Sequence, residues 1–340
     1  MTAWLFPGQG TQQVGMGQAL RMAFPDVVGP VLDQAWALDP ELATLMRRGP
    51  LSRLARTEHS QLAVTATNLS ALAVLRRGRP EPAGGIGGVR AVAGHSVGFL
   101  SALVAAGSLE VGAALRLARL RGELMGSLPP GGTMASINGL TLAETQDLIA
   151  RAGRETGATV VIGLVNGPLA IVVSGEESAV DRVCALAAGR GARSTRLSVS
   201  HAFHSPLMRG VRDPWSGIVR GQPFLAPAAP LIADLTGEVI ESPERIRDVL
   251  VDQLTSTVRW DLVCARLTAA GPPEAIDAIG AIEAIEVGDS AVLRGFARSY
   301  PGLHVSSMAQ PQTLARFRPA RERLTVPVVP GLTKEEAMNG

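Results

Sequence analysis

The sequence contains only two cysteines, a single lysine and few aromatic residues. The cysteines, Cys184 and Cys264, form neither a CxxC pair nor a cluster with histidines, which argues against a zinc site, an iron–sulfur site and a disulfide framework. Such cysteine usage favours a reducing, cytoplasmic setting. Aromatic residues make up 4% of the chain, whereas alanine, valine, leucine and 38 glycines are prominent, a composition that favours closely packed α/β layers.

Strong charge of one sign and long apolar runs are also absent. The 32 basic and 30 acidic residues give a net charge of +2 and are spread along the chain, so we expect binding neither to nucleic acid nor to an anionic membrane surface. No apolar run reaches the roughly 18 residues that span a bilayer, and the amino terminus has no basic segment followed by an apolar one. We therefore expect no membrane segment and no export signal.

The first part of the chain predicts a strand–turn–helix arrangement around Ser96. Residues 89–94, VRAVAG, form a short β-like run, and from residue 99 to 128 apolar residues recur at helical spacing. Residues 2–6 form another β-like run, which a glycine-rich turn ends, and residues 60–77 predict a core helix. A chain of this length is compatible with one large domain that carries a smaller insertion.

In residues 131–199, short β-like segments alternate with helical ones more often than in the preceding part of the chain. Their β-like and helical segments follow the order βαββαβ, with Thr141 and Glu144 placed to cap the first helix. That order is typical of a ferredoxin-like unit. We therefore predict an α/β fold with a small ferredoxin-like subdomain inserted into a large one. The boundaries are 1–130 and 200–320 for the large subdomain, 131–199 for the small one and 321–340 for a carboxy-terminal extension.

Ser96 lies in the pattern Gly94-His-Ser-Val-Gly98, at the predicted passage from a strand to a helix. Small flanking residues there permit the strained turn, called a nucleophile elbow, that exposes a reactive serine hydroxyl. A tight turn without chemistry gives the same five-residue pattern, so the motif alone leaves both interpretations open. A serine nucleophile also needs a base, which is usually a histidine.

Five histidines could supply that base. His95 adjoins the serine, where a sharp turn sends successive side chains apart, and we expect His59 and His304 to be structural. His201 and His204 remain, on the segment that leaves the small subdomain.

Two further features suit acyl chemistry. The turn Gly8-Gln9-Gly10 can supply a backbone N–H to an oxyanion hole, and it matches neither of the common phosphate-loop patterns. The helical stretch after residue 111 offers an arginine to an anionic substrate, although a solvated helix face is the alternative for most of these arginines. The candidates are Arg116, Arg119 and Arg121.

Six short motifs together resemble those of the malonyl-CoA:acyl-carrier-protein transacylases and the acyltransferase domains of polyketide synthases. They occur in that family's order and comprise FPGQGTQ at 6–12, GHSVG at 94–98, LRG at 120–122, HAFHSPLM at 201–208, DQL at 252–254 and EVG at 286–288. The resemblance implies an α/β-hydrolase-like large subdomain with a ferredoxin-like small one, the same division that the periodicity gives.

The same resemblance implies roles in catalysis for particular residues. Ser96 is the nucleophile that carries the acyl group as an ester, and His204 is its base. The backbone carbonyl of Gln253 orients that base in place of an acidic residue. The backbone amides of Gln9 and Val97 form the oxyanion hole.

Other matches imply which acyl group is selected. Arg121 corresponds to the family's arginine that pairs with the free carboxylate of a malonyl-type group, a bond worth about 1.5–3 kcal/mol. His201 and Phe203 resemble the form of the motif associated with malonyl, in which Phe203 fills the space of an α-methyl group. Discrimination by one methyl group is worth roughly 1–3 kcal/mol. Val97 points the same way, since methylmalonyl enzymes often have glutamine there.

The chain departs from the family pattern at three places. Gln61 is followed by leucine where proline is common, Ala170 stands where a pocket glutamine is frequent, and Gly-Asp-Ser at 288–290 replaces Gly-Pro-Gly. Gln61 and Asn166 are further candidates for the pocket, whose shape Ala170 could alter. Some of these features resemble the transacylase subunit of malonate decarboxylase.

The resemblance implies a cytoplasmic, monomeric enzyme for polyketide or fatty-acid synthesis. It moves a malonyl group from malonyl-CoA, through a Ser96 ester, to the phosphopantetheine thiol of an acyl carrier protein, with no metal and no bound cofactor. With no ketosynthase or carrier sequence attached, we expect a discrete enzyme that acts in trans. The alternatives are the transacylase subunit of malonate decarboxylase, an editing acyl-hydrolase or thioesterase with the same site, and a docking protein with a relict site.

Overall fold

A six-stranded sheet forms the centre of the larger part of the computed structural model, which describes residues 2–77, 88–269 and 282–317. Its strands are β1 (Thr2–Phe6), β2 (Val89–Gly94), β7 (Leu231–Ile232), β8 (Val239–Ile240), β10 (Ile282–Glu286) and β11 (Leu303–Ser307). They lie in the order β11-β10-β1-β2-β7-β8. Neighbours are parallel except for the antiparallel pair β7 and β8.

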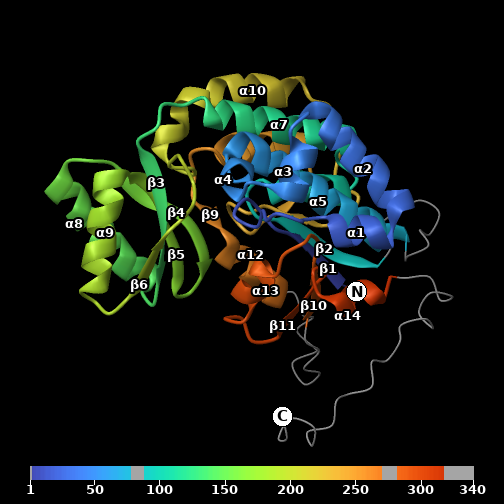
Figure 1. Ribbon diagram of the computed structural model, residues 1–340. Coiled ribbons are helices and arrows are strands. Elements are labelled where there is room, and N and C mark those ends of the chain that lie inside the picture. Colours follow the sequence, from blue (N-terminus) through green and yellow to red (C-terminus); the bar gives the residue numbers. More distant parts are fainter. Residues whose placement is uncertain (1, 78–87, 270–281, 318–340) are drawn as a thin grey trace, which may run out of the picture.

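Helices cover both faces of this sheet (Figure 1). The helix bounds are Gln18–Ala23 (α1), Pro25–Leu38 (α2), Leu42–Arg48 (α3), Leu51–Leu54 (α4), Thr57–Arg77 (α5), Gly98–Ala105 (α6), Val111–Gly126 (α7), Arg212–Gly221 (α10), Pro243–Asp252 (α11), Trp260–Ala269 (α12), Val292–Ala297 (α13) and Pro311–Ala315 (α14), with a 3₁₀ helix at Pro206–Val211.

Side chains of β1 alternate between the two helical layers, as the pleat of a strand requires. Trp4 and Phe6 pack into the core that includes α5, α6 and α7, whereas Ala3 and Leu5 face α12 and α13. Figure 1 shows α5 and α7 on one side of β1 and β2, and α12 and α13 on the other. Since both faces are covered, these strands are apolar along their length.

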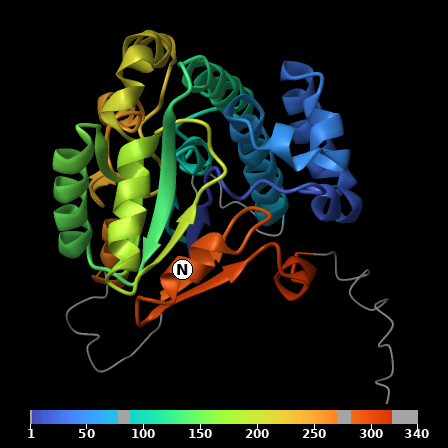
Figure 2. The ribbon, with the colours of Figure 1, turned by 60° about the vertical axis from the view of Figure 1, so that its left-hand side comes forward.

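A second sheet of five strands lies beside the first (Figures 1 and 2). Its elements follow the predicted order βαββαβ, and the predicted capping box of Thr141 and Glu144 begins the first helix. These elements are β3 (Gly132–Asn138), α8 (Leu142–Thr156), β4 (Val160–Gly167), β5 (Ala170–Glu176), α9 (Glu177–Ala188) and β6 (Arg193–Arg196).

The second sheet also recruits a strand from outside the predicted segment 131–199. Its order is β6-β3-β5-β4-β9, where β9 (Val258–Arg259) pairs in parallel with β4. The spacing of apolar residues near 258–270 predicts a helix, but the structure places a two-residue strand at its start and begins α12 at Trp260. Because β9 is the next element after α11, the pairing of β9 with β4 keeps the end of α11 close to the second sheet.

The core helix that the sequence predicts near the start of the chain is present. The predicted core helix at 60–77 lies within α5, whose side chains are buried along nearly the whole length. The predicted extension at 321–340 lies outside the described residues. Within the described ranges, no helix is long and apolar enough to cross a membrane, and both cysteines are free thiols.

Candidate active site

The passage from β2 to α6 forms a sharp turn with Ser96 at its apex. Ser96 has a φ of 52°, in the left-handed region that non-glycine residues seldom adopt. Neither flanking glycine has room for a side chain: a Cβ on Gly94 would lie 2.2 Å from the carbonyl carbon of Gly98, and one on Gly98 would lie 2.3 Å from the oxygen of Phe6. The two glycines therefore allow the turn to fold tightly against β1, which is the backbone shape of a nucleophile elbow.

The structure brings Ser96 and His204 together across 108 positions of the chain. The Ser96 Oγ and His204 Nε2 atoms are 2.8 Å apart, and His204 Nδ1 is 2.7 Å from the backbone oxygen of Gln253. Because a carbonyl oxygen only accepts, Nδ1 carries the proton and Nε2 is free to accept one from the hydroxyl. This arrangement can deprotonate the serine.

Burial keeps this imidazole neutral. His204 is 4% exposed, and burial, followed by the positive charge of Arg121, lowers its pKa to about 3. A neutral histidine at pH 7 is ready to act as a base. His95, the neighbour of Ser96, points elsewhere: its Nε2 lies 2.8 Å from Oδ1 of Asn166, as expected for successive side chains at a sharp turn.

A buried carboxylate that sequence reasoning missed lies beneath the turn. Asp234, two residues after β7, is fully buried, and its Oδ2 accepts a hydrogen bond of 2.9 Å from the amide of Ser96. Its two carboxylate oxygens also accept from Nε2 of Gln253, at 2.8 and 3.0 Å. The available signal was a lone acidic residue in the apolar stretch LIADL at 231–235.

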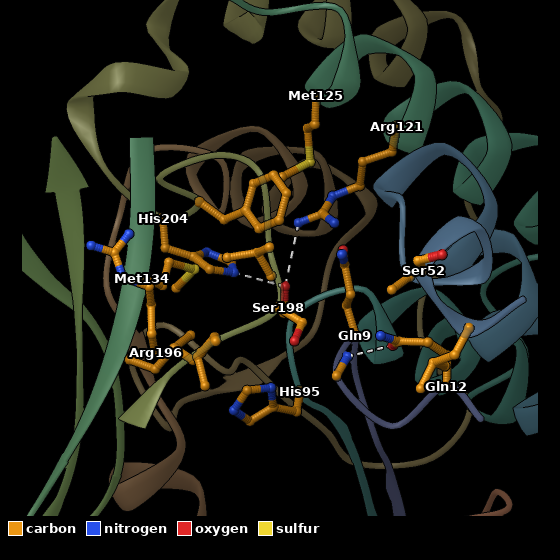
Figure 3. Close-up of a pocket in the computed structure, with 18 residues that line it drawn as sticks. Gln9, Gln12, Ser52, His95, Arg121, Met125, Met134, Arg196, Ser198 and His204 are labelled. Atoms are coloured by element: carbon orange, nitrogen blue, oxygen red, sulfur yellow. Dashed lines mark hydrogen bonds between the residues drawn. The ribbon is translucent and has the colours of Figure 1, made fainter. Parts of the chain in front are cut away.

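Arg121 of α7 also approaches the Ser96 hydroxyl, and Figure 3 shows the side chains of Arg121 and His204 pointing into the same part of the cavity. It is 2% exposed; its Nη2 lies 3.5 Å from Ser96 Oγ, and its Nη1 donates to Oε1 of Gln61 at 2.8 Å. Burial lowers the pKa of Arg121 to about 10, which leaves it a cation at pH 7. Its Nε has no hydrogen-bond partner, and within the described ranges no acidic side chain forms an ion pair with it.

The other two candidate arginines of α7 do not share this place. Arg119 donates to Asp39 at 2.9 Å and to Glu123 at 2.8 Å, and Arg116 is exposed. Arg121 is therefore the member of the three whose charge faces the serine.

Two residues close to Ser96 have backbone amides without a hydrogen-bond acceptor in the described part of the chain. Among the described residues, neither the amide of Gln9 nor that of Val97 donates a hydrogen bond. Gln9 lies in the turn after β1, and Val97 immediately precedes α6, whose amino-terminal dipole favours negative charge. Such free donors are what an oxyanion hole requires.

A cavity of about 510 Å³ opens beside Ser96 (Figure 3). Its lining combines polar side chains, among them Arg121 and His204, with apolar ones, and the cavity is large enough for a short acyl group with part of its carrier arm. The apolar lining residues are Leu51, Ala55, Met125, Met134, Leu164, Leu197, Val199 and Phe203.

Four of the predicted site residues contribute indirectly to this cavity or lie next to it. His201 does not line the cavity but stacks on Phe203, with ring centroids 6.0 Å apart. Gln61 lies behind Arg121 and holds it, and the Val97 side chain is packed in the core. Asn166 lines an adjoining cavity of about 350 Å³, next to His95.

The described residues contain no cluster of three or more histidine, cysteine, aspartate or glutamate side chains arranged to hold a metal ion. The site around Ser96 combines a serine, a neutral histidine, two amide donors and a buried cation. This combination supports nucleophilic substitution at a carbonyl group.

Comparisons with known proteins show the family of the chain. A model of the acyl transferase domain matches residues 3–278. Polyketide synthase GfsB of Streptomyces halstedii is 36% identical over 278 residues, which cover 79% of this chain but only 5% of the synthase. The malonyl CoA-acyl carrier protein transacylase of Escherichia coli (strain K12) is 32% identical over 320 residues, covering 92% of this chain and 97% of that protein.

The fold is likewise that of solved acyltransferases. The crystal structure of an acyl-carrier-protein-S-malonyltransferase from Bartonella henselae superposes with a TM-score of 0.83 and 30% identity, over 96% of this chain and all of that one. The chain thus has the α/β fold of solved malonyltransferases. The chain belongs to the acyl transferase domain family.

Proposed function

We propose that this chain transfers a malonyl group from malonyl-CoA to the phosphopantetheine thiol of an acyl carrier protein, through an ester on Ser96. The relative from Escherichia coli is a malonyl CoA-acyl carrier protein transacylase, and the one from Bartonella henselae is an acyl-carrier-protein-S-malonyltransferase. The proposal extends their activity to this chain because the residues around Ser96 suit the same chemistry.

The observation that carries the proposal is the buried guanidinium of Arg121, which forms no ion pair within the described ranges and whose charge Asp234 offsets only in part. A buried cation without an ion-pair partner is costly, so a site that retains one is suited to an anion that arrives with the substrate. The acyl group attached to Ser96 would bring its free carboxylate beside Arg121, because Nη2 already lies 3.5 Å from Oγ. An acetyl or fatty acyl group has no such carboxylate and would leave the guanidinium unpaired.

The proposed roles follow from the geometry. Ser96 is the nucleophile, and His204 is the base, oriented by the carbonyl of Gln253. The amides of Gln9 and Val97 hold the oxyanion of each tetrahedral intermediate.

The reaction has two balanced halves. In the first, His204 takes the hydroxyl proton while Ser96 Oγ attacks the thioester carbonyl; the carbon–sulfur bond then breaks, and the proton passes to the departing CoA thiolate. In the second, the carrier thiol attacks the ester carbonyl, His204 takes the thiol proton, and Ser96 leaves with that proton. The proposal includes no metal and no bound cofactor.

We propose that Phe203 restricts the acyl group to malonyl. Its ring is part of the wall beside Ser96, its backbone oxygen accepts from Ser174 Oγ at 2.5 Å, and His201 stacks behind the ring. Held in this way, the ring occupies space that an α-methyl substituent would need. Gln61 would fix Arg121, and Asn166 would belong to the adjoining part of the cleft.

The finer description of the chain is also a proposal. We propose an α/β-hydrolase-like large subdomain at 1–130 and 200–320, a ferredoxin-like small subdomain at 131–199, and a monomeric, cytoplasmic protein. The strand order β6-β3-β5-β4 with α8 and α9 supports the ferredoxin-like assignment.

The test is to incubate the protein with malonyl-CoA and a phosphopantetheinylated carrier protein, and to measure malonyl-carrier and free malonate in the same sample. We expect malonyl-carrier to form faster than malonate. Release of malonate at an equal or greater rate would identify a hydrolase. Acylation of Ser96 without acceptance by carrier proteins of fatty-acid and polyketide synthesis would direct attention to the carrier of malonate decarboxylase.

A further inference from the structure

We propose that Asp234 is a positioning residue for the Ser96–His204 pair, because one buried carboxylate holds both the backbone of the nucleophile and the residue that orients the base. The proposal rests on the proposed function in so far as Ser96 is the residue acylated. Asp234 touches neither the cavity nor the His204 ring.

The two strands that deliver these residues are neighbours. β2 and β7 pair in parallel, with Ala93 opposite Ile232, so the chain segments that follow them leave the sheet at the same edge. Ser96 and Asp234 therefore meet just beyond the sheet although 138 positions separate them.

The carboxylate binds two donors of different function. Its bond to the Ser96 amide supports a residue whose φ of 52° is a strained conformation costing about 1–3 kcal/mol. Its bonds to Gln253 Nε2 fix the side chain of the residue whose carbonyl oxygen receives the His204 Nδ1 proton. Displacing the carboxylate would loosen nucleophile and base together.

The backbone of Asp234 is itself anchored. Its carbonyl oxygen accepts a hydrogen bond of 2.7 Å from the amide of Arg259 in β9, the strand that joins the second sheet. Asp234, just beyond the carboxyl end of β7, thus connects the first sheet to the second. Ser96 lies at this junction.

The negative charge has its own effect on proton transfer. Among the described residues, the charged side chain that acts on Asp234 is Arg121; His204 is connected to it through Ser96 and Gln253, and His95 acts on His204. When His204 takes the serine proton, the site gains a second buried cation beside Arg121, and the Asp234 carboxylate lowers the total positive charge by offsetting part of that of Arg121. Burial raises the pKa of Asp234 to about 6, so this compensation is lost as pH falls through that value.

The experiment compares the wild-type protein with Asp234→Asn and with a matched control, Glu286→Gln. Glu286 is also a fully buried carboxylate at the end of a strand of the first sheet, and it accepts from the amides of Val292 and Arg294 instead of from site residues. Two rates are measured between pH 5 and pH 8. One is acylation of Ser96 by malonyl-CoA, and the other is sulfonylation of Ser96 by phenylmethanesulfonyl fluoride.

Sulfonylation uses the same nucleophile and base without the proposed substrate. The Oγ–sulfur bond forms, the sulfur–fluorine bond breaks, fluoride leaves and His204 takes the hydroxyl proton. If malonyl-CoA fails to acylate the wild type while the sulfonyl fluoride reacts, the proposed function is wrong and Asp234 remains testable.

For Asp234→Asn we expect both rates at pH 7.5 to fall by about 10- to 100-fold, the range for a small misplacement of reacting groups. We also expect the wild type to lose rate as pH falls below about 6, and this dependence to be absent in Asp234→Asn because its amide does not titrate. Glu286→Gln should keep the wild-type rate and pH profile. A folded Asp234→Asn protein with wild-type rates and the wild-type fall near pH 6 would overturn the proposal.

A second variant separates positioning from a loss of folding. Asp234→Ala removes every acceptor, so we expect it to be slower than Asp234→Asn, which keeps one oxygen for the Ser96 amide. Equal rates for the two variants, with equal thermal unfolding midpoints, would contradict a positioning role.

Discussion

Ser96 and His204 share an uncommon backbone conformation as well as a hydrogen bond. They are the two non-glycine residues with positive φ in the ranges 2–77, 88–269 and 282–317, at 52° and 58°, and their Oγ and Nε2 atoms lie 2.8 Å apart. Each such conformation costs about 1–3 kcal/mol and persists only where surrounding structure enforces it. Both partners of this hydrogen bond thus have a strained backbone, which indicates that the surrounding structure holds the pair in place.

The glycines of the elbow give the first prediction. Gly98→Ala would place a Cβ 2.3 Å from the oxygen of Phe6, so we expect a loss of several kcal/mol in the free energy of unfolding, or no folded protein. Gly217→Ala in α10 meets no atom within 4 Å and should stabilise by about 0.5–1 kcal/mol. Urea unfolding of both variants checks this, and a Gly98→Ala protein as stable as wild type would show that the contact with β1 is dispensable.

Removal of the buried cation gives the second prediction. Arg121→Gln should lower the rate of Ser96 acylation by malonyl-CoA by roughly 10- to 100-fold, since a bond to a charged group is worth about 1.5–3 kcal/mol. The rate with acetyl-CoA should stay level or rise. Rapid-quench measurement of the acyl-enzyme with each thioester gives both rates.

The control for this variant lies on the same helix. Arg116 is exposed, and Arg116→Gln removes the same charge without touching the cavity. It should leave the preference for malonyl-CoA unchanged. An equal loss in Arg116→Gln and Arg121→Gln would mean that general attraction of an anion, and not a bound carboxylate, sets the rate.

The third prediction concerns the wall of the cavity. Phe203→Ser should raise acylation by methylmalonyl-CoA relative to malonyl-CoA by about 10-fold, because the ring fills the space of the extra methyl group. Competition between the two thioesters, read by mass spectrometry, measures the ratio directly. An unchanged ratio would place selection for the methyl group elsewhere in the cleft.

The fourth prediction is a pH dependence of stability. The pKa of His204 is lowered from 6.5 to about 3 in the folded protein, so between these values the unfolded chain binds a proton that the folded protein does not. The contribution of His204 to the free energy of unfolding is fully present above pH 6.5 and is lost as pH falls. At pH 5 the loss is on the order of 2 kcal/mol.

His204→Asn isolates this effect, since asparagine tolerates positive φ and does not titrate. Asp234 remains in both proteins, so its opposite dependence cancels in the comparison. We expect the thermal midpoint to fall less between pH 7.5 and pH 5 in the variant than in the wild type. An equal fall in both proteins would contradict the lowered pKa of His204.

Much of this site could be predicted from local sequence. The passage from β2 to α6, the capped helix α8 and the order βαββαβ follow from apolar periodicity and turn residues, which depend on neighbouring positions. The meeting of Ser96 with His204, Gln253 and Arg121 came from resemblance to a family, because residues so far apart in the chain have no local signal of contact. The structure places them together.

Asp234 and β9 show what local sequence could not provide. A two-residue strand has no detectable periodicity, and the pairing of β9 with β4 depends on where the second sheet lies. Asp234 follows an equally short strand, β7, and the significance of its carboxylate depends on the parallel pairing of β7 with β2. Both features are set by the packing of the two sheets.

The central claim is that Ser96 carries a malonyl group whose carboxylate Arg121 recognises. The most direct measurement is the intact mass of the wild-type and Ser96→Ala proteins after incubation with malonyl-, methylmalonyl- and acetyl-CoA. We predict one malonyl adduct on the wild type, less of the other two adducts, and none on Ser96→Ala. Preferential acetylation of the wild type, or a malonyl adduct that persists in Ser96→Ala, would contradict the account.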